Sequence, residues 1–213
     1  MRILNWTEPR EPILAAAAEC LRNGGLVVFP TDTLYGLGAA AANDEAVKRL
    51  YEAKKRPPEN PLPILIADMQ GAAAVAEEVG PLALRLGNRY WPGPLTIVLK
   101  RSARFRSIAL AGGDSVALRV PDHAVPRELI RALGEPITGT SANLSGQPSP
   151  RAAAEVAAQL AASVDIVIDA GPCPVGKEST VVDLTGERPR LLREGAIGRR
   201  ELEAVIGMKL EDG

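Results

Sequence analysis

The chain has 213 residues, of which 46% are hydrophobic and 24% are charged, a composition that excludes a disordered or fibrous protein. Its 25 Lys and Arg residues nearly balance 26 Asp and Glu residues, which argues against a global attraction to nucleic acid or to an anionic membrane. Any site for a polyanion must therefore be local. The length predicts one large domain over residues 1–213, with its core at about residues 12–198.

The termini and the cysteines predict a cytoplasmic protein that makes no membrane contact. Residues Met1 to Glu8 carry charges where a signal peptide needs an apolar core, and no stretch approaches the roughly 18 apolar residues of a membrane span. Cys20 and Cys173 have no metal-ligand spacing, and a single disulfide is unusual in a reducing compartment, so both are expected to be packing residues. The single histidine, His123, argues against zinc and Ser-His-Asp mechanisms.

Periodicity, caps and prolines predict helices along the whole chain. One begins at the N-cap Asn43 and ends on the basic run Lys54-Lys55-Arg56 before two prolines. Another is capped by Ser149 and opens with Pro150, which suits a first helical position. The predicted helices cover residues 12–23, 43–56, 70–79, 81–90, 125–133, 150–162 and 199–206.

Short apolar or alternating runs between these helices predict strands. They cover residues 26–29, 62–67, 95–99, 115–120, 135–138, 165–170, 180–184 and 190–193. The last two are joined by a turn, so some strand pairs must be antiparallel. Alternating strands and helices without a repeat predict an α/β fold with one twisted, mixed (parallel and antiparallel) sheet and flanking helices.

Polar residues follow the first predicted strand and end the helix after it. The turn from Thr31 to Gly38 is rich in hydroxyls and glycines, and Asp32 in it could cap the turn or contact a metal or water. The run Lys54-Lys55-Arg56 is either an ordinary basic helix end or part of an anion site.

Two further features have a structural and a functional interpretation. Arg119 shares a strand face with Ser115 and Ala117, and a cation there needs either a carboxylate of the protein or a bound anion. The loop from Gly139 to Gly146 is crowded with hydroxyls and amides, so it is either a turn held by its own side chains or a polar wall for a ligand.

Two apparent motifs fail on inspection. Residues 171–178 have the P-loop spacing, but Glu178 stands where a magnesium-binding hydroxyl is required, and a strand follows instead of a helix. Residues 139–143 start like a nucleophile elbow, but Asn143 replaces the second glycine. Chemistry must therefore rest on positioning and charge neutralisation, as in phosphoryl or nucleotidyl transfer, for which Lys54, Arg56, Arg193 and the hydroxyl loop are suitable parts.

Three separated segments resemble the threonylcarbamoyl-adenylate (threonylcarbamoyl-AMP) synthase family, whose domain is called YrdC-like. They are Pro30 to Gly38, Lys54 to Pro57, and Ser141 to Asn143, and they stand in the family's order. The resemblance extends from about Ala15 to Ile197. It implies a YrdC-like fold with a central cleft, in the family's short single-domain form.

The resemblance also implies a reaction. Family members condense L-threonine, bicarbonate or CO2, and ATP to threonylcarbamoyl-AMP and pyrophosphate, without a covalent enzyme intermediate. Magnesium would be held through the phosphates, with no direct protein ligand. Separate tRNA threonylcarbamoyl-transferase proteins would then pass the activated group to the adenosine at position 37 of tRNA.

By the same resemblance, particular residues of this chain would hold the substrates. L-threonine would be bound by Thr33, Arg119, Gly139 and Ser179. ATP would be bound by Lys54, Arg56, Asn60, Ser115, Ser141, Asn143, Ser149 and Arg193, with Lys54 and Arg56 catalytic. Many relatives have a polar residue, often histidine, where this chain has Leu65, so recognition of the threonine side chain differs here in detail.

Two alternatives stay open at this point. One is a paralogue of the same fold that forms a carbamoyl-adenylate. The other is a binding module for double-stranded RNA or tRNA, although the net charge of -1 argues against RNA binding as the sole role. If the hypothesis of a synthase is right, we expect Arg56→Ala and Arg119→Ala each to cripple activity, because the loss of one partner of a buried charged contact typically costs about 2 to 5 kcal/mol of binding free energy.

Overall fold

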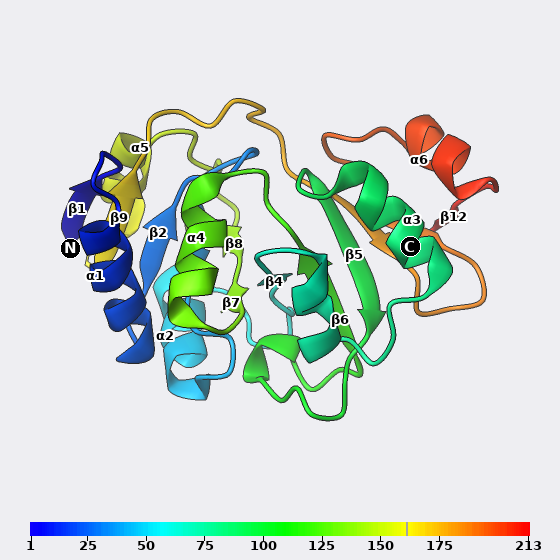
Figure 1. The fold of residues 1–213 in the computed structure, drawn as a ribbon, viewed down its shortest axis with the longest axis horizontal. Helices are drawn as coiled ribbons and strands as arrows, with labels where there is room; N and C mark the ends of the chain where they lie inside the picture. The colour runs from blue at the N-terminus through cyan, green and yellow to red at the C-terminus, as the bar shows by residue number, and fades with distance from the viewer. Residues whose placement is uncertain (161) are drawn as a thin grey trace.

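The computed structural model describes residues 1–160 and 162–213, which form two mixed sheets with helices packed on them (Figure 1). The five-stranded sheet has the order β1 (Arg2–Asn5), β9 (Ile166–Asp169), β2 (Val27–Phe29), β3 (Gly36–Gly38) and β8 (Thr140–Ser141). The seven-stranded sheet has the order β12 (Glu211–Asp212), β11 (Arg190–Arg193), β10 (Thr180–Asp183), β5 (Leu95–Lys100), β6 (Ser115–Arg119), β4 (Ile64–Leu65) and β7 (Ile137–Thr138).

Both sheets combine parallel and antiparallel pairs, so the predicted mixed α/β class is confirmed. β9 pairs in parallel with β1 and β2, whereas β3 runs antiparallel to β2 and β8. In the larger sheet, β5 pairs in parallel with β10 and antiparallel with β6. The strands divide between two sheets, however, and do not form the single twisted sheet that was expected.

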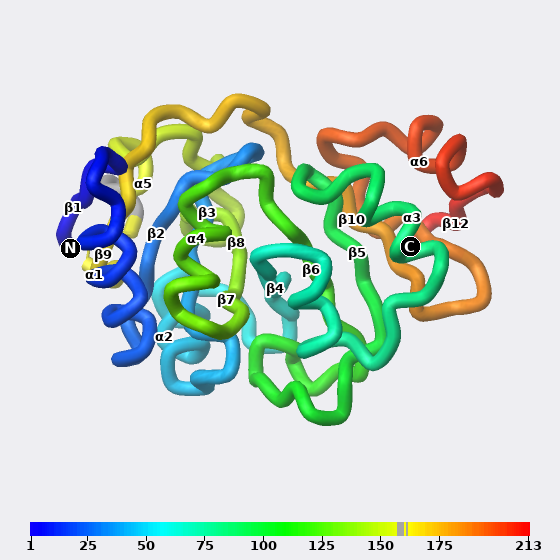
Figure 2. The backbone as a smooth tube through the Cα atoms, viewed as in Figure 1, coloured from blue at the N-terminus to red at the C-terminus, as the bar shows by residue number. Residues whose placement is uncertain are grey.

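A short seam joins the two sheets. Just after β3, Ala40 forms an antiparallel bridge with Ile137 of β7. Beside it, the Thr138 N–H donates to the Ala39 carbonyl over 2.9 Å, and the Ala39 N–H donates to Thr138 Oγ1 over 3.0 Å. At the other side of the molecule, residues 170–179 run from β9 across to β10 (Figure 2). The seam and this connection together hold the two sheets beside each other.

The helices begin and end mostly where local rules place them. The α-helices are α1 (Glu11–Arg22), α2 (Asp44–Lys54), α3 (Pro81–Tyr90), α4 (Ala124–Leu133), α5 (Ala153–Leu160) and α6 (Arg199–Ile206). Asn43 caps α2 by accepting from the Ala46 N–H over 3.1 Å, as predicted. His123 caps α4 through Nδ1, and burial lowers the pKa of this imidazole. Within the described residues, none of the helices has the length and apolar character that crossing a bilayer requires.

The predicted helix over residues 70–79 is wrong. A 3-10 helix, η1 (Met69–Ala74), takes its place; a second one is η2 (Ile108–Leu110). The chain leaves η1 because Ala76 forms a bridge with Arg101, and the Glu77 N–H donates to the Lys100 carbonyl over 2.9 Å. These contacts with the end of β5 compete with the helical hydrogen bonds, and residue spacing alone does not reveal them.

Other boundaries also shift. β4 is shorter than the predicted strand at residues 62–67, since Pro61 and Pro63 beside it have no N–H to donate. The helix predicted over residues 150–162 begins at Ala153, because the Pro150 carbonyl accepts from the Tyr35 N–H over 2.9 Å; residue 161 lies outside the described residues. Strands β1 and β12 lie outside the predicted core at residues 12–198.

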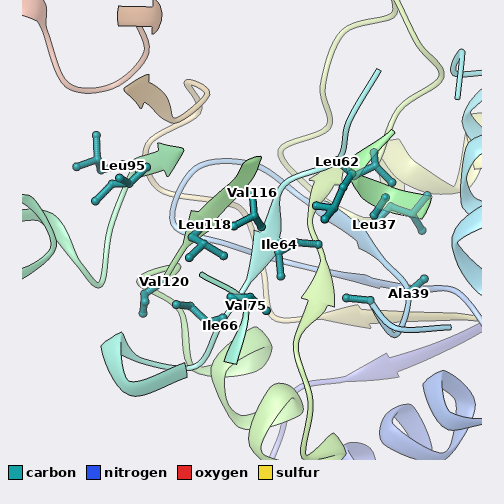
Figure 3. Packing of buried hydrophobic residues seen from close by; sticks show 14 of the residues in the cluster. Leu37, Ala39, Leu62, Ile64, Ile66, Val75, Leu95, Val116, Leu118 and Val120 are labelled. Carbon is teal, nitrogen blue, oxygen red and sulfur yellow. The ribbon is translucent and has the colours of Figure 1, made fainter. Parts of the chain in front are cut away.

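The interior consists of two apolar clusters. The larger one runs through both sheets and includes Leu37 of β3, Ala39 just after it, and Ile64 and Leu118 from the other sheet (Figure 3). The smaller one lies between α1, α4 and the five-stranded sheet, with Phe29 in it. Burial of these side chains supplies the main stabilisation, at about 1.5 to 3 kcal/mol for each large one. The larger cluster therefore packs the two sheets against each other.

Candidate active site

A cavity of about 420 Å³ lies between the two sheets. The five-stranded sheet and the turn at residues 31–36 contribute one wall, and β4, β5, β6, β10 and β11 contribute the other. Backbone register places lining residues of different strands side by side: Leu65 of β4 lies beside Arg119 of β6, and Gly36 of β3 lies opposite Ser141 of β8. The cavity is therefore assembled from segments that are far apart in the chain.

At the inner end of the cavity lies the inner arginine cluster, formed by Asp32, Thr33 and Arg119. Arg119 Nη2 donates to Asp32 Oδ1 over 2.5 Å, Nη1 donates to Thr33 Oγ1 over 3.0 Å, and Nε donates to the Gly93 carbonyl over 3.0 Å. Arg119 is 8% exposed and Asp32 5%. Burial lowers the pKa of the guanidinium and Asp32 opposes this effect, so the arginine stays charged. These bonds use three of its five N–H groups, which leaves one on each terminal nitrogen for a ligand.

Hydrogen-bond directions around Thr33 can be assigned from the single hydrogen of each hydroxyl. Thr31 Oγ1 donates its single hydrogen to the Leu34 carbonyl over 2.7 Å and accepts from the N–H groups of Thr33 and Leu34, so it has no further hydrogen for Thr33 Oγ1, which lies 2.9 Å away. Thr33 Oγ1 accepts from Arg119 with one lone pair. Its second lone pair can accept a hydrogen bond from an amine or ammonium group in the cavity.

A second group, the outer arginine cluster, consists of Glu178, Ser179 and Arg193. Arg193 Nε and Nη2 donate to the carbonyl and hydroxyl of Ser179, each over 3.1 Å, and Nη1 forms an ion pair with Glu178 Oε2 at 2.7 Å. Ser179 Oγ also contacts Thr96 Oγ1 at 2.9 Å. Ser179 is buried, whereas the side chains of Arg193 and Glu178 are 45% and 46% exposed. A ligand therefore reaches this guanidinium more readily than that of Arg119.

Arg56 adds a third guanidinium to the cavity lining. It follows Lys55, whose left-handed backbone (φ 50°) ends α2, and it donates through Nε and Nη2 to the carbonyls of Asn60 and Pro61. The Asn60 carbonyl also accepts from the Tyr51 hydroxyl over 3.0 Å. Asn60 therefore contributes backbone support for Arg56, while its own side chain is exposed.

Lys54 is turned into the protein. Its Nζ donates to the Ser141 carbonyl over 2.5 Å and to the Asn143 carbonyl over 2.7 Å, and its own carbonyl accepts from the Ser145 N–H over 3.0 Å. The residue is 1% exposed. Burial, and to a smaller extent the charge of Arg56, lower the pKa of the ammonium to about 8, while Glu178 opposes the shift. Lys54 thus fixes the loop that carries the Ser141 hydroxyl.

These features agree with comparisons to known proteins. The Sua5/YciO/YrdC family model, described as "Telomere recombination", matches residues 19–195 of this chain. The chain belongs to this family. A threonylcarbamoyl-AMP synthase of Pyrococcus abyssi (strain GE5 / Orsay) is 46% identical over 191 residues, covering 90% of this chain and 56% of the relative. One of Bacillus subtilis (strain 168) is 44% identical over 198 residues, covering 92% and 57%.

Solved structures of the Sua5/YciO/YrdC family agree with the fold. The crystal structure of P. abyssi Sua5 complexed with L-threonine superposes on this chain with a TM-score of 0.94 at 44% identity. The match covers 99% of this chain and 62% of the other. The chain thus spans little more than half the length of these two curated relatives.

The structure brings most of the predicted ligand residues of this family member into the cavity. Those that line it are Thr33, Arg56, Ser115, Arg119, Gly139, Ser141, Ser179 and Arg193. Those outside the lining are Lys54, Asn60, Asn143 and Ser149. Asn143 is buried behind the wall, where its Nδ2 donates to the carbonyls of Leu144 and Gln147. The roles assigned to all twelve residues stay predictions.

Sequence reasoning missed two residues of the site. The sequence offers two roles for Asp32, a turn cap or a contact with a metal or water. In the structure it pairs with Arg119 and accepts from the Asp122 N–H over 3.1 Å. The structural alternative for Arg119, a salt bridge within the protein, is therefore present in the fold. Glu178 breaks the P-loop pattern and is given no site role by the sequence, yet it lines the cavity. Its position directly before Ser179, a predicted substrate-binding residue, was the sequence signal that could have indicated it.

The cavity suits anion binding without a built metal centre. Three guanidiniums line it, and among the described residues Glu178 is the only carboxylate that does so. The described residues contain no group of three or more His, Cys, Asp or Glu side chains that could hold a metal ion. A lining with so few carboxylates is compatible with a Mg²⁺ ion that keeps most of its water and phosphate ligands, since Mg²⁺ rarely uses an all-protein cage.

Proposed function

We propose that this chain is an L-threonylcarbamoyladenylate synthase, a nucleotidyltransferase that uses L-threonine, bicarbonate or CO2, and ATP. The observation that carries the proposal is the pair of arginine clusters in one cavity. The inner one offers two N–H groups and a threonine hydroxyl, which suit the carboxylate and amine of a small amino acid. The outer one offers an accessible cation, which suits a phosphate group. The names of the relatives and the L-threonine bound to P. abyssi Sua5 support the same substrates.

In the proposed reaction, the inner arginine cluster binds the amino acid. The two remaining N–H groups of Arg119 hold the carboxylate in a bidentate pair, and Thr33 Oγ1 accepts from the amine. Leu65 and Gly139 line the wall beside it. The amine nitrogen attacks the carbon of CO2 and releases a proton to water, which forms a carbamate. Because the cluster is buried and already hydrogen-bonded, it orients the amine with little reorganisation.

The carbamate oxygen then attacks the α-phosphorus of ATP, and the bond from this phosphorus to the bridging oxygen breaks, releasing pyrophosphate. Arg56 and Arg193 neutralise charge on the phosphate chain, while Lys54 holds the Ser141 loop in place. Magnesium, bound through the phosphates, would supply further charge neutralisation. The product would pass to separate transferase proteins that modify adenosine 37 of tRNA.

The test is product formation from ATP, L-threonine and bicarbonate with Mg²⁺, followed by mass spectrometry and by pyrophosphate release. We expect threonylcarbamoyl-AMP and pyrophosphate in equal amounts. Pyrophosphate release that does not depend on threonine would contradict the proposal. Carbamoyl phosphate in place of threonine and bicarbonate tests the alternative carbamoyl-adenylate former, and serine in place of threonine tests selectivity.

A further inference from the structure

Glu178 is the charged residue of the described cavity lining to which no substrate role has been assigned. Its Oε2 pairs with Arg193 Nη1 at 2.7 Å, and both side chains are about half exposed. It places a negative charge among the guanidiniums of Arg56, Arg119 and Arg193 in the cavity lining. It also acts on the buried ammonium of Lys54, whose positive charge it favours. A carboxylate at this position opposes any anion that approaches Arg193.

The backbone around Glu178 is fixed, whereas its side chain reaches into the cavity. The Glu178 carbonyl accepts from the Ala196 N–H over 2.9 Å, and the Thr180 N–H donates to the Pro94 carbonyl over 2.9 Å. Gly195 permits this close approach, because a Cβ there would lie 2.3 Å from the Glu178 carbonyl oxygen. The carboxylate can therefore leave Arg193 by rotation of its side chain alone.

Arg193 does not depend on Glu178 for its place. Its Nε and Nη2 stay bonded to the Ser179 carbonyl and hydroxyl, which are anchored in turn by the start of β10. Only Nη1, the nitrogen that Glu178 occupies, would change partner. An oxygen of a phosphate group has the charge and the acceptor geometry to replace the carboxylate oxygen there.

We infer that Glu178 is an internal counterion of Arg193 that is exchanged for a phosphate oxygen when the nucleotide binds. This inference rests on the proposed function, because it takes the outer arginine cluster as the site of the phosphate chain. The exchange favours a multiply charged polyphosphate over a weaker anion, since the ligand must outcompete a carboxylate that is already in place. It also lets Glu178 pair with Arg193 again when pyrophosphate leaves.

The experiment compares the wild type with Glu178→Gln and Glu178→Ala by isothermal titration calorimetry, using ATP and inorganic pyrophosphate as probes, each with and without Mg²⁺. We expect both variants to bind both probes about three- to fivefold more tightly, because an exposed ion pair is typically worth up to about a factor of five. AMP should gain less. Tighter binding cannot result from misfolding, and thermal unfolding confirms that the variants are folded.

Glu194→Gln is the matched control. It makes the same change in charge next to Arg193 in the sequence, but Glu194 is exposed and forms no ion pair with any described residue. Its affinities should equal those of the wild type. Unchanged or weaker binding in both Glu178 variants would overturn the inference, and a loss seen only with Mg²⁺ would identify Glu178 as a ligand of that ion instead.

The inference and the proposed function can fail separately. If the wild type makes no threonine-dependent product but the Glu178 variants bind ATP more tightly, the counterion role stands and the proposed reaction is wrong. If the product forms but the affinities do not rise, only the counterion role is wrong. If the wild type binds neither ATP nor pyrophosphate, both are wrong.

Discussion

The two arginine clusters face the same cavity but differ in how firmly each is held. In the inner cluster, Arg119 is 8% exposed and donates to three groups of the protein, including the buried carboxylate of Asp32. In the outer cluster, Arg193 is 45% exposed, and its acidic partner Glu178 is equally accessible. The first arginine is fixed before a ligand arrives, whereas the second can change partners.

This difference matches the two kinds of ligand that the proposed reaction needs. A buried ion pair is costly to break, so the inner cluster keeps one geometry and can select a small zwitterion by shape and hydrogen bonds. An exposed ion pair contributes little to stability, so the outer cluster can open for a flexible polyphosphate chain at low cost. The predictions below test this contrast, from the largest expected effect on the free energy of unfolding to the smallest.

Arg119→Ala should lower the free energy of unfolding by about 3 to 5 kcal/mol, because it leaves the Asp32 carboxylate buried without its cation. Arg193→Ala, the control from the outer cluster, should cost about 1 kcal/mol or less. Urea denaturation followed by circular dichroism measures both values. Similar losses in the two variants would remove the contrast between the clusters.

Lys54→Met tests whether the ammonium that holds the Ser141 loop is buried in the folded protein. The pKa of Lys54 falls from 10.5 to about 8 in the folded protein, so between these pH values the unfolded chain binds the extra proton. The stability of the wild type relative to Lys54→Met should therefore rise with pH across this window, by up to about 3 kcal/mol.

Urea denaturation at several pH values from 7 to 10.5 would measure this slope. Lys55→Met is the control, since Lys55 is exposed and has the same charge on the next residue. A flat difference between the wild type and Lys54→Met would show that Lys54 keeps its ordinary pKa.

Gly139→Ala should destabilise the inner wall of the cavity by about 1 to 3 kcal/mol through overpacking. A Cβ at this position would lie 2.4 Å from Leu65 Cγ. Leu65→Ala in the same chain removes the clash. The double variant should therefore lose less unfolding free energy than the two single variants lose in sum. Additive losses would mean that Gly139 and Leu65 are not in contact.

Arg56→Ala should change the free energy of unfolding by about 0.5 kcal/mol or less, because its partners, the carbonyls of Asn60 and Pro61, remain open to water. Threonine-dependent pyrophosphate release should nevertheless fall about 10- to 100-fold, as expected when a charged hydrogen bond of about 1.5 to 3 kcal/mol is lost. Equal activity in this variant and the wild type would remove Arg56 from the site.

Sequence reasoning succeeded where a signal is local. The cap at Asn43 and the prolines near residues 57 and 81 fix helix ends within a few residues, and the structure agrees with them. It failed where distant segments compete for the same backbone groups. The helix expected after residue 70 is lost to a bridge between Ala76 and Arg101, whose pairing no spacing rule encodes.

The same limit applies to the candidate site. The family's motifs gave the residue types, and eight of the twelve predicted positions line the cavity. The direction in which each side chain points could not be predicted from the sequence, because its hydrogen-bond partners lie far away along the chain. Lys54 donates to carbonyls 87 and 89 residues away, and Arg119 pairs with a carboxylate 87 residues before it. Such contacts follow from the packing of the two sheets and leave no pattern in the sequence.

The seam between the sheets has a consequence for how the protein could move during turnover. Ala40 and Ile137 bridge the two sheets, and Ala39 and Thr138 add hydrogen bonds beside them. Two sheets tied in this way resist hinge bending, so we expect the two substrates to approach through rotamer changes on a nanosecond scale, such as rotation of the Glu178 side chain, without slow domain closure. Relaxation-dispersion NMR should accordingly find little millisecond exchange in β3 and β7, with or without nucleotide.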